Sequence, residues 1–238
     1  MRVVLLHGLT NSSRAFDRLV PLLDGLDVST IDLPGHGSRA GQPGKRTVDE
    51  IAAAVIPEIP RPAILVGHSL GGSTATAIAE RRPDLVTHLV LVNSPPSVEA
   101  RRVASRGGEK VLRTPVLGSI VWHTMPRSAA RDGLRSAFAP GYKIPEFFVD
   151  DMRLLKWRTF VDGTGAVDAF VGEKSLYDRV RSLGLPTTVV FGALDQRIEF
   201  ASLGGYASTQ ADVVTVADAG HTPAWETPEA VAEVLRSL

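Results

Sequence analysis

The feature that most constrains the fold is a regular alternation of short apolar runs with helix-like segments. Runs rich in β-branched residues occupy residues 3–6, 28–33, 63–66 and 89–92, and the signal returns after Leu185 in "PTTVVFG" and "DVVTV". Because these runs are continuously apolar, they are typical of strands buried on both faces. The helix-like segments between them start at polar residues, as in "TVDEIAAAVIPEI", where Thr47 is the expected N-cap. The pattern predicts an α/β fold whose mostly parallel sheet is covered by helices on both faces.

One stretch departs from this pattern. Residues 95–184 carry most of the aromatic side chains and little strand signal, so we expect a helical lid inserted into a core formed by residues 1–94 and 185–238. Four side chains of this stretch are candidates for a substrate pocket, namely Trp122, His123, Phe147 and Trp157. Between Glu99 and Arg135, eight basic residues face three acidic ones. Either a solvated helix face or an attraction for anionic substrates or a membrane surface fits this charge.

Composition excludes several classes of function. The 238 residues fit one domain with a small insertion, and equal numbers of basic and acidic residues give no indication of nucleic acid as a partner. The absence of cysteine rules out disulfides and thiolate ligands, and no metal-ligand cluster or dinucleotide fingerprint is visible, so we expect no metal and no cofactor. The N-terminus lacks the pattern of a signal peptide, and no apolar run approaches the roughly 20 residues of a membrane helix. We therefore expect a cytoplasmic protein without a transmembrane segment.

The motif that carries chemistry is "GHSLGG", which begins at Gly67. It matches the glycine-x-serine-x-glycine pattern of a nucleophile elbow, a tight turn from strand to helix that exposes the serine hydroxyl. Glycines at 67 and 71 avoid clashes in such a turn, and Ser69 would lie at a helix N-terminus, where negative charge is favoured. The motif alone is a weak signal, but here "PAILV" predicts the strand before it and "STATAIAERR" the helix after it.

A serine nucleophile needs a base and an orienting carboxylate. His221 lies in a loop after the last predicted strand, and Asp195 follows the strand "TTVVFG". Functional groups gather at the carboxyl ends of parallel strands, and Ser69, Asp195 and His221 all meet that condition in the order serine, acid, histidine. Asp32 and His36 in "DLPGHGSR" are expected to hold a loop instead.

With these motifs the chain resembles the α/β-hydrolase fold superfamily, in its serine esterase and lipase-like branch. "HGLTNSS" resembles the oxyanion loop, "DLPGHGSR" the next loop, "GALD" the acid site and "GH" the histidine loop. The resemblance implies an oxyanion hole formed by the backbone N–H groups of Leu9 and Leu70. The family often begins with an antiparallel strand pair, whereas here the first strand starts at residue 2. We therefore expect a reduced sheet of about six strands, with a less covered edge that would suit a homodimer.

The expected function is a serine hydrolase that cleaves a small-molecule carboxylic ester, thioester or lactone through an acyl-enzyme intermediate. Serine at position 69 argues against dehalogenase and epoxide hydrolase chemistry, for which the family uses aspartate. Relatives that are cyanohydrin lyases usually carry lysine where Thr222 stands, and perhydrolases tend to carry an aromatic residue in place of Leu9. Two alternatives stay open: a non-catalytic receptor on the same fold, and an acyltransferase or perhydrolase that uses the same residues.

Overall fold

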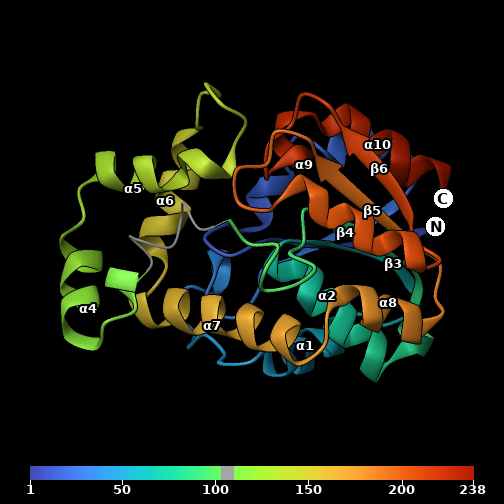
Figure 1. Ribbon diagram of the computed structural model, residues 1–238, viewed down its shortest axis with the longest axis horizontal. Helices are drawn as coiled ribbons and strands as arrows, with labels where there is room; N and C mark the ends of the chain where they lie inside the picture. The colour runs from blue at the N-terminus through green and yellow to red at the C-terminus, as the bar shows by residue number, and fades with distance from the viewer. Residues whose placement is uncertain (103–109) are drawn as a thin grey trace.

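The sheet observed in the structure has six strands, all parallel, in the order β2-β1-β3-β4-β5-β6. The computed structural model describes residues 1–102 and 110–238 (Figure 1). The chain runs outward from β1 to β2 and then returns to the other side of β1, so the carboxyl ends of the central strands form a crevice. The strands are β1 (Arg2–Leu6), β2 (Asp27–Ile31), β3 (Ala63–His68), β4 (Val86–Val92), β5 (Thr187–Gly192) and β6 (Asp212–Val216).

Each central strand sends alternate side chains to two hydrophobic cores. In β1, Val4 and Leu6 join the core on one face, and Val3 and Leu5 join the core on the other. These four side chains have no solvent exposure, which explains why the strand is a continuous apolar run. The outermost strands β2 and β6 are much more exposed, as expected for the edges of a sheet. Pairing of two copies through such an edge stays a prediction.

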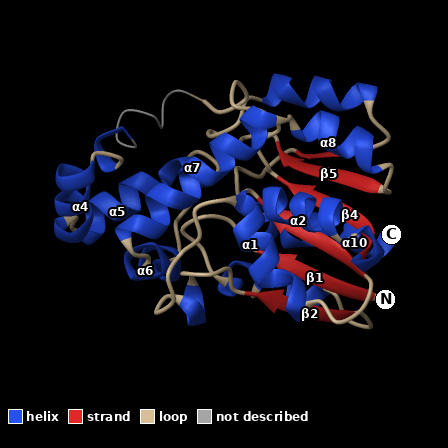
Figure 2. Cartoon of the chain, turned by 90° about the horizontal axis from the view of Figure 1, so that it is seen from below, coloured by secondary structure: helices blue, strands red, loops and turns tan. Residues whose placement is uncertain are grey.

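Helices cover both faces, as the sequence predicts. The face that Figure 2 shows in front carries α1 (Val48–Val55) and α2 (Leu70–Arg81). The opposite core contains residues of α9 (Pro223–Glu226) and α10 (Pro228–Ser237). Short 3-10 helices complete the core: η1 (Ser13–Phe16), η2 (Val20–Leu22), η3 (Gly37–Arg39), η4 (Ile56–Glu58), η5 (Pro83–Leu85) and η8 (Phe200–Ser208).

Within the described residues, the segment 95–184 between β4 and β5 is mainly helical, as the sequence predicts; "the insertion" below means residues 95–184. Its helices include α4 (Pro115–Thr124), α5 (Arg127–Leu134), η7 (Arg135–Ala137), α6 (Glu146–Leu154), α7 (Trp157–Glu173) and α8 (Leu176–Leu183). Residues 103–109, which include part of the predicted basic segment, lie outside the described residues. Figure 2 shows α4, α5 and α6 at one end of the molecule and the strands at the other, with α7 running between them.

The insertion divides between two cores. Side chains of α4, α5, α6 and the first turn of α7 form a core of their own, which includes Trp122, Phe138 and Phe148. Phe170 of α7 and Val180 of α8, by contrast, belong to the large core beneath the sheet. The second half of the insertion therefore packs as part of the α/β layer, although it lies before residue 184. Its action as a lid stays a prediction.

Proline limits two of the helices that the sequence predicts. Residues 12–23, "SSRAFDRLVPLL", have a helix-like pattern with a serine at its start, but they form the separate turns η1 and η2 rather than one helix, with Pro21 inside η2. Helix α1 begins after Thr47, whose hydroxyl accepts the N–H of Glu50, and passes at Ile56 into η4, which contains Pro57. A proline ring cannot donate a backbone hydrogen bond and crowds the preceding turn.

Among the described residues, no helix combines the length and the apolar character needed to cross a bilayer.

Candidate active site

Ser69 occupies the turn between β3 and α2 in a strained backbone conformation, with φ 53° and ψ −115°. A Cβ atom at Gly67 would collide with the carbonyl of Gly71, and one at Gly71 would collide with the carbonyl of Leu6. Only glycine therefore permits so tight a turn at these two positions. Non-glycine residues in such conformations are concentrated at functional sites, where the surrounding structure holds them in place.

Asp195 and His221 are hydrogen-bonded, with 2.7 Å between His221 Nδ1 and Asp195 Oδ2. Asn93 Nδ2 donates to the same carboxylate oxygen, while the other oxygen accepts the backbone N–H groups of Arg197 and Ile198. Burial alone would favour the neutral acid, but the imidazole and these donors outweigh it, so the pKa of Asp195 lies below its ordinary value. The carboxylate is therefore ionised and holds the His221 ring by its Nδ1–H.

Asn93 ties three strand ends together. It follows β4 with φ 40°, a conformation that asparagine tolerates better than most residues. Its side-chain oxygen accepts the N–H of Gly192 at the end of β5, and its amide nitrogen donates to Asp195 and to the carbonyl of Gly220. One buried side chain thereby links the loops that carry the acid and the histidine.

Two further buried groups hold the loop of His221. The Glu226 carboxylate accepts the N–H groups of Gly220 and Thr222, which flank His221, and also that of Ala139 in the insertion. On the other side, His68 Nε2–H donates to the His221 carbonyl over 2.8 Å. Burial lowers the pKa of His68 to about 3, so this ring is neutral. Residues that lie beside the site thus fix the backbone on both sides of His221.

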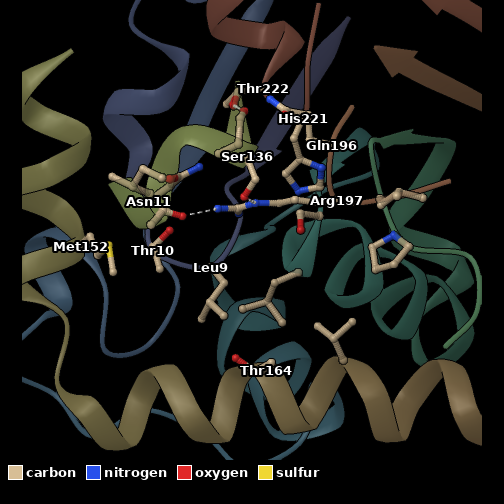
Figure 3. A pocket seen from close by; sticks show the side chains of 18 of the residues that line it. Leu9, Thr10, Asn11, Ser136, Met152, Thr164, Gln196, Arg197, His221 and Thr222 are labelled. Atoms are coloured by element: carbon tan, nitrogen blue, oxygen red, sulfur yellow. Dashed lines mark hydrogen bonds between the residues drawn. The ribbon is translucent and has the colours of Figure 1, made fainter. Parts of the chain in front are cut away.

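Ser69 and His221 line the same cavity, which has a volume of about 530 Å³ and is large enough for a small organic substrate. In Figure 3, the polar side chains Gln196, Arg197 and Ser136 lie on the same side of the cavity as His221, and Leu9 and Thr164 lie on the opposite side. The apolar part of the wall includes Leu9, Leu70, Leu112, Met152, Phe160 and Val167.

The backbone N–H groups of Leu9 and Leu70 are available at this cavity. Within residues 1–102 and 110–238, neither donates to a protein oxygen, and both residues line the cavity. His7 accounts for the direction of the first group: its Nδ1–H donates to the Gly8 carbonyl over 2.8 Å, and its Nε2 accepts the N–H of Leu33. In a trans peptide the N–H of Leu9 points away from the Gly8 carbonyl. Burial lowers the pKa of His7, which keeps it neutral in this role.

A family model described as the alpha/beta hydrolase family matches residues 3–234. The chain belongs to this family. An esterase of Mycobacterium tuberculosis is 29% identical over the whole chain and 82% of the relative. A pimeloyl-[acyl-carrier protein] methyl ester esterase of Neisseria meningitidis is 38% identical over 122 residues, which are 50% of this chain and 45% of that relative. Among solved structures, a putative lipase from Acinetobacter baumannii superposes with a TM-score of 0.77 at 21% identity, covering 99% of this chain and 82% of the other.

The four candidate pocket residues of the insertion are not among the side chains that line the cavity of this hydrolase-family chain. The indole nitrogens of Trp122 and Trp157 donate to backbone carbonyls, and Phe147 packs against Phe148 and Trp225. His123 is exposed on α4 and interacts with the carbonyl of Ser119. Aromatic richness marks the core of the insertion here, because a small helical layer needs large side chains to bury enough area.

The residues that sequence reasoning did not single out are Asn93, Glu226, Arg197, Leu112 and Phe160. Asn93 had one available signal, a polar residue directly after the apolar run of β4. The others lie on helices or loops whose approach to the cavity depends on tertiary packing. Asp32, expected to hold a loop, accepts the N–H groups of Ser13 and Ser38. Among the described residues, no group of three potential ligands could hold a metal ion.

Proposed function

We propose that the protein is a serine hydrolase that cleaves a carboxylic ester, thioester or lactone of a small molecule through an acyl-enzyme intermediate. The observation that carries the proposal is the 2.7 Å hydrogen bond between His221 and Asp195, in a cavity that also contains Ser69 at a strained turn. Membership of the alpha/beta hydrolase family and relatives named esterases support the same activity.

In the first half-reaction Ser69 Oγ attacks the carbonyl carbon while His221 Nε2 accepts the hydroxyl proton. Asp195 keeps the ring in the tautomer whose Nδ1 bears hydrogen and stabilises the imidazolium that forms. The carbonyl oxygen becomes an oxyanion, and the N–H groups of Leu9 and Leu70 donate to it, assisted by the N-terminus of α2. The tetrahedral intermediate then collapses, and the imidazolium returns the proton to the leaving alcohol or thiol.

In the second half-reaction a water molecule attacks the acyl-enzyme. His221 again accepts a proton, now from water, and afterwards returns it to Ser69 Oγ as the ester bond to the enzyme breaks. One ester and one water thus give one acid and one alcohol, and the enzyme is regenerated. The imidazole can act in both directions because Glu226, His68 and Asp195 hold its loop and its ring in place.

The test is hydrolysis of p-nitrophenyl esters from acetate to palmitate by the wild type and Ser69→Ala. We expect turnover to fall by about 10⁴- to 10⁶-fold in the variant, because the nucleophile is lost. Ser73→Ala is the matched control, since Ser73 is a buried serine of the same helix whose hydroxyl makes no hydrogen bond within the described residues. Equal rates for the wild type and folded Ser69→Ala would overturn the proposal.

A second arm separates the alternatives. A fluorophosphonate probe should label the wild type at Ser69 and leave Ser69→Ala unlabelled. Absence of both labelling and ester hydrolysis in folded protein would favour a receptor. Ester formation with added alcohol at the expense of hydrolysis would favour an acyltransferase. We also propose that the helical insertion acts as a lid, that the protein forms a homodimer, and that it is located in the cytoplasm.

A further inference from the structure

The wall of the cavity that contains Ser69 carries several charged side chains. Arg135 is exposed and forms an ion pair with Asp132, its neighbour one turn earlier. Arg101 contacts Asp168 of α7. Arg197 differs from these two in its position, because it follows the acid Asp195 by two residues and lies on the same side of the cavity as His221 (Figure 3).

Arg197 is built into the site at both ends. Its backbone N–H donates to Asp195 Oδ1 over 2.7 Å, which sets the start of the side chain beside the acid. Its guanidinium is half-buried: Nε donates to Ser136 Oγ over 3.1 Å and one terminal nitrogen contacts the Gly133 carbonyl. These contacts reach the insertion at α5 and η7, so the guanidinium is held at the cavity wall rather than extended into solvent.

The charge of Arg197 affects a histidine that lies beside the site. It is one of the groups that lower the pKa of the neighbouring His68, after the larger effects of burial and of His221. His68 is the last residue of β3 and directly precedes Ser69 in the chain. A guanidinium near a partly enclosed cavity favours a planar anion, and carboxylates fit its fork of N–H donors best.

The rest of the wall is largely apolar, with Leu9, Leu70, Leu112, Phe160 and Val167 facing the same space. A substrate that suits both parts has an aliphatic chain and one anionic end. We propose that the substrate is a carboxylic ester that also carries a free carboxylate, a half-ester of a dicarboxylic acid, and that Arg197 binds this carboxylate. This inference rests on the proposed function, and it adds the class of substrate.

The reaction balances as ester hydrolysis. The half-ester and water give a dicarboxylic acid, which ionises to the dicarboxylate with release of a proton, and the alcohol. The dicarboxylate product still contains the group that Arg197 binds, and we therefore expect it to inhibit competitively.

The experiment compares kcat/KM for monoethyl esters of dicarboxylic acids, from succinate to suberate, with ethyl esters of monocarboxylic acids of equal carbon number. We expect the wild type to prefer the half-ester at one chain length, which then measures the reach from Ser69 to Arg197. In Arg197→Gln the ratio of the two kcat/KM values at that length should fall by about 10- to 100-fold, as for loss of a hydrogen bond to a charged group. Arg197→Lys, which keeps the charge but not the fork, should retain part of the preference.

Two control variants separate binding from packing. Arg135→Gln removes a positive charge from the same wall and should change the ratio by less than about threefold, because exposed ion pairs contribute little. Ser136→Ala removes one of the contacts that hold the guanidinium while the charge is kept, and should lower the preference for the half-ester less than Arg197→Gln does, because the backbone bond to Asp195 and the contact with Gly133 remain. A ratio that is equal in the wild type and Arg197→Gln, or that falls as far in Arg135→Gln, would overturn the inference.

The same data distinguish this failure from failure of the proposed function. Hydrolysis of neutral esters that depends on Ser69, without preference for half-esters, would leave the serine mechanism intact and refute only the role of Arg197. Absence of hydrolysis of both ester series by folded wild type would refute the serine hydrolase itself.

Discussion

The strand-end loops after β3, β5 and β6 and the helical insertion between β4 and β5 contribute to one cavity in different ways. The loops place Ser69, Asp195 and His221 through backbone geometry and buried hydrogen bonds, such as those of Asn93 and Glu226. The insertion contributes Leu112, which precedes α4, Met152 of α6 and Phe160 of α7; all three pack in or against its separate aromatic core. We infer that the loops determine the type of reaction, and that the insertion acts together with Arg197 of the β5 loop in choosing the substrate.

Replacing Asp195 with asparagine should have the largest effect among the following changes. The amide cannot hold the Nδ1–H tautomer of His221 as a carboxylate does, and we expect kcat to fall by about 10⁴-fold. Steady-state kinetics with a p-nitrophenyl ester, at equal circular dichroism, measure this. Asp218→Asn, in the loop before His221, is the control and should remain close to wild type. An equal fall of kcat in Asp195→Asn and Asp218→Asn would show that Asp195 has no special role in catalysis.

Glu226→Gln tests the connection between the two regions. The carboxylate accepts three backbone N–H groups, two beside His221 and one in the insertion, and an amide has a single acceptor oxygen. We expect the free energy of unfolding to fall by about 1–3 kcal/mol and kcat to fall more than KM rises. Urea denaturation and steady-state kinetics measure the two effects.

The exposed Glu229, in the first turn of α10, supplies the control variant Glu229→Gln. Glu226→Asp should recover part of kcat because it restores two acceptor oxygens. If kcat per folded molecule in Glu226→Gln matched that of wild type, the role of Glu226 would be limited to stability.

Phe160→Ala and Phe147→Ala sharpen the assignment of substrate choice to the insertion. Both rings are half-buried aromatic residues of the insertion, but only Phe160 lines the cavity. We expect Phe160→Ala to raise kcat/KM for long acyl esters relative to short ones by about tenfold. The enlarged pocket then accommodates additional methylene groups of the acyl chain. The chain-length profile of p-nitrophenyl esters measures this, and Phe147→Ala should leave the profile unchanged. Equal shifts in both would show that the insertion acts as a whole.

Two buried histidines that lie at or after the carboxyl ends of strands should make the stability of the protein sensitive to acid. Burial lowers the pKa of His36 and His68 to about 3, against an ordinary 6.5, so both stay neutral when folded and gain protons when unfolded below 6.5. Stability from these groups is therefore present above 6.5 and is lost as the pH falls towards 3. The free energy of unfolding should fall between about pH 7 and 5.5. In His36→Gln this fall should be smaller than in the wild type by about 1 kcal/mol.

Urea unfolding at the two pH values measures this difference. His123→Gln, which replaces an exposed histidine of the insertion, is the control. A slope that decreases in His123→Gln instead would place the acid sensitivity in the insertion.

The strands, their parallel sheet and the placement of Ser69, Asp195 and His221 after strand ends could be predicted from the sequence, because each follows from local rules. A continuously apolar run must be buried on both faces, and a serine between glycines after such a run requires a tight turn. The lengths of helices were less predictable where proline intervenes: residues 12–23 form two 3-10 turns, and α1 ends before Pro57.

Only the tertiary structure decided which side chains surround the nucleophile. Trp122, Phe147 and Trp157 have the composition of a pocket, yet they pack into the core of the insertion, while Leu112 and Phe160 face the cavity. The same holds for Asn93 and Glu226, whose partners lie far away in the chain. Periodicity along a segment reports whether a side chain is buried, but not against which distant segment it packs. That choice depends on how whole helices and loops pack together. The candidate residues Ser69, Asp195 and His221 could therefore be proposed from the sequence, whereas the shape of the pocket could not.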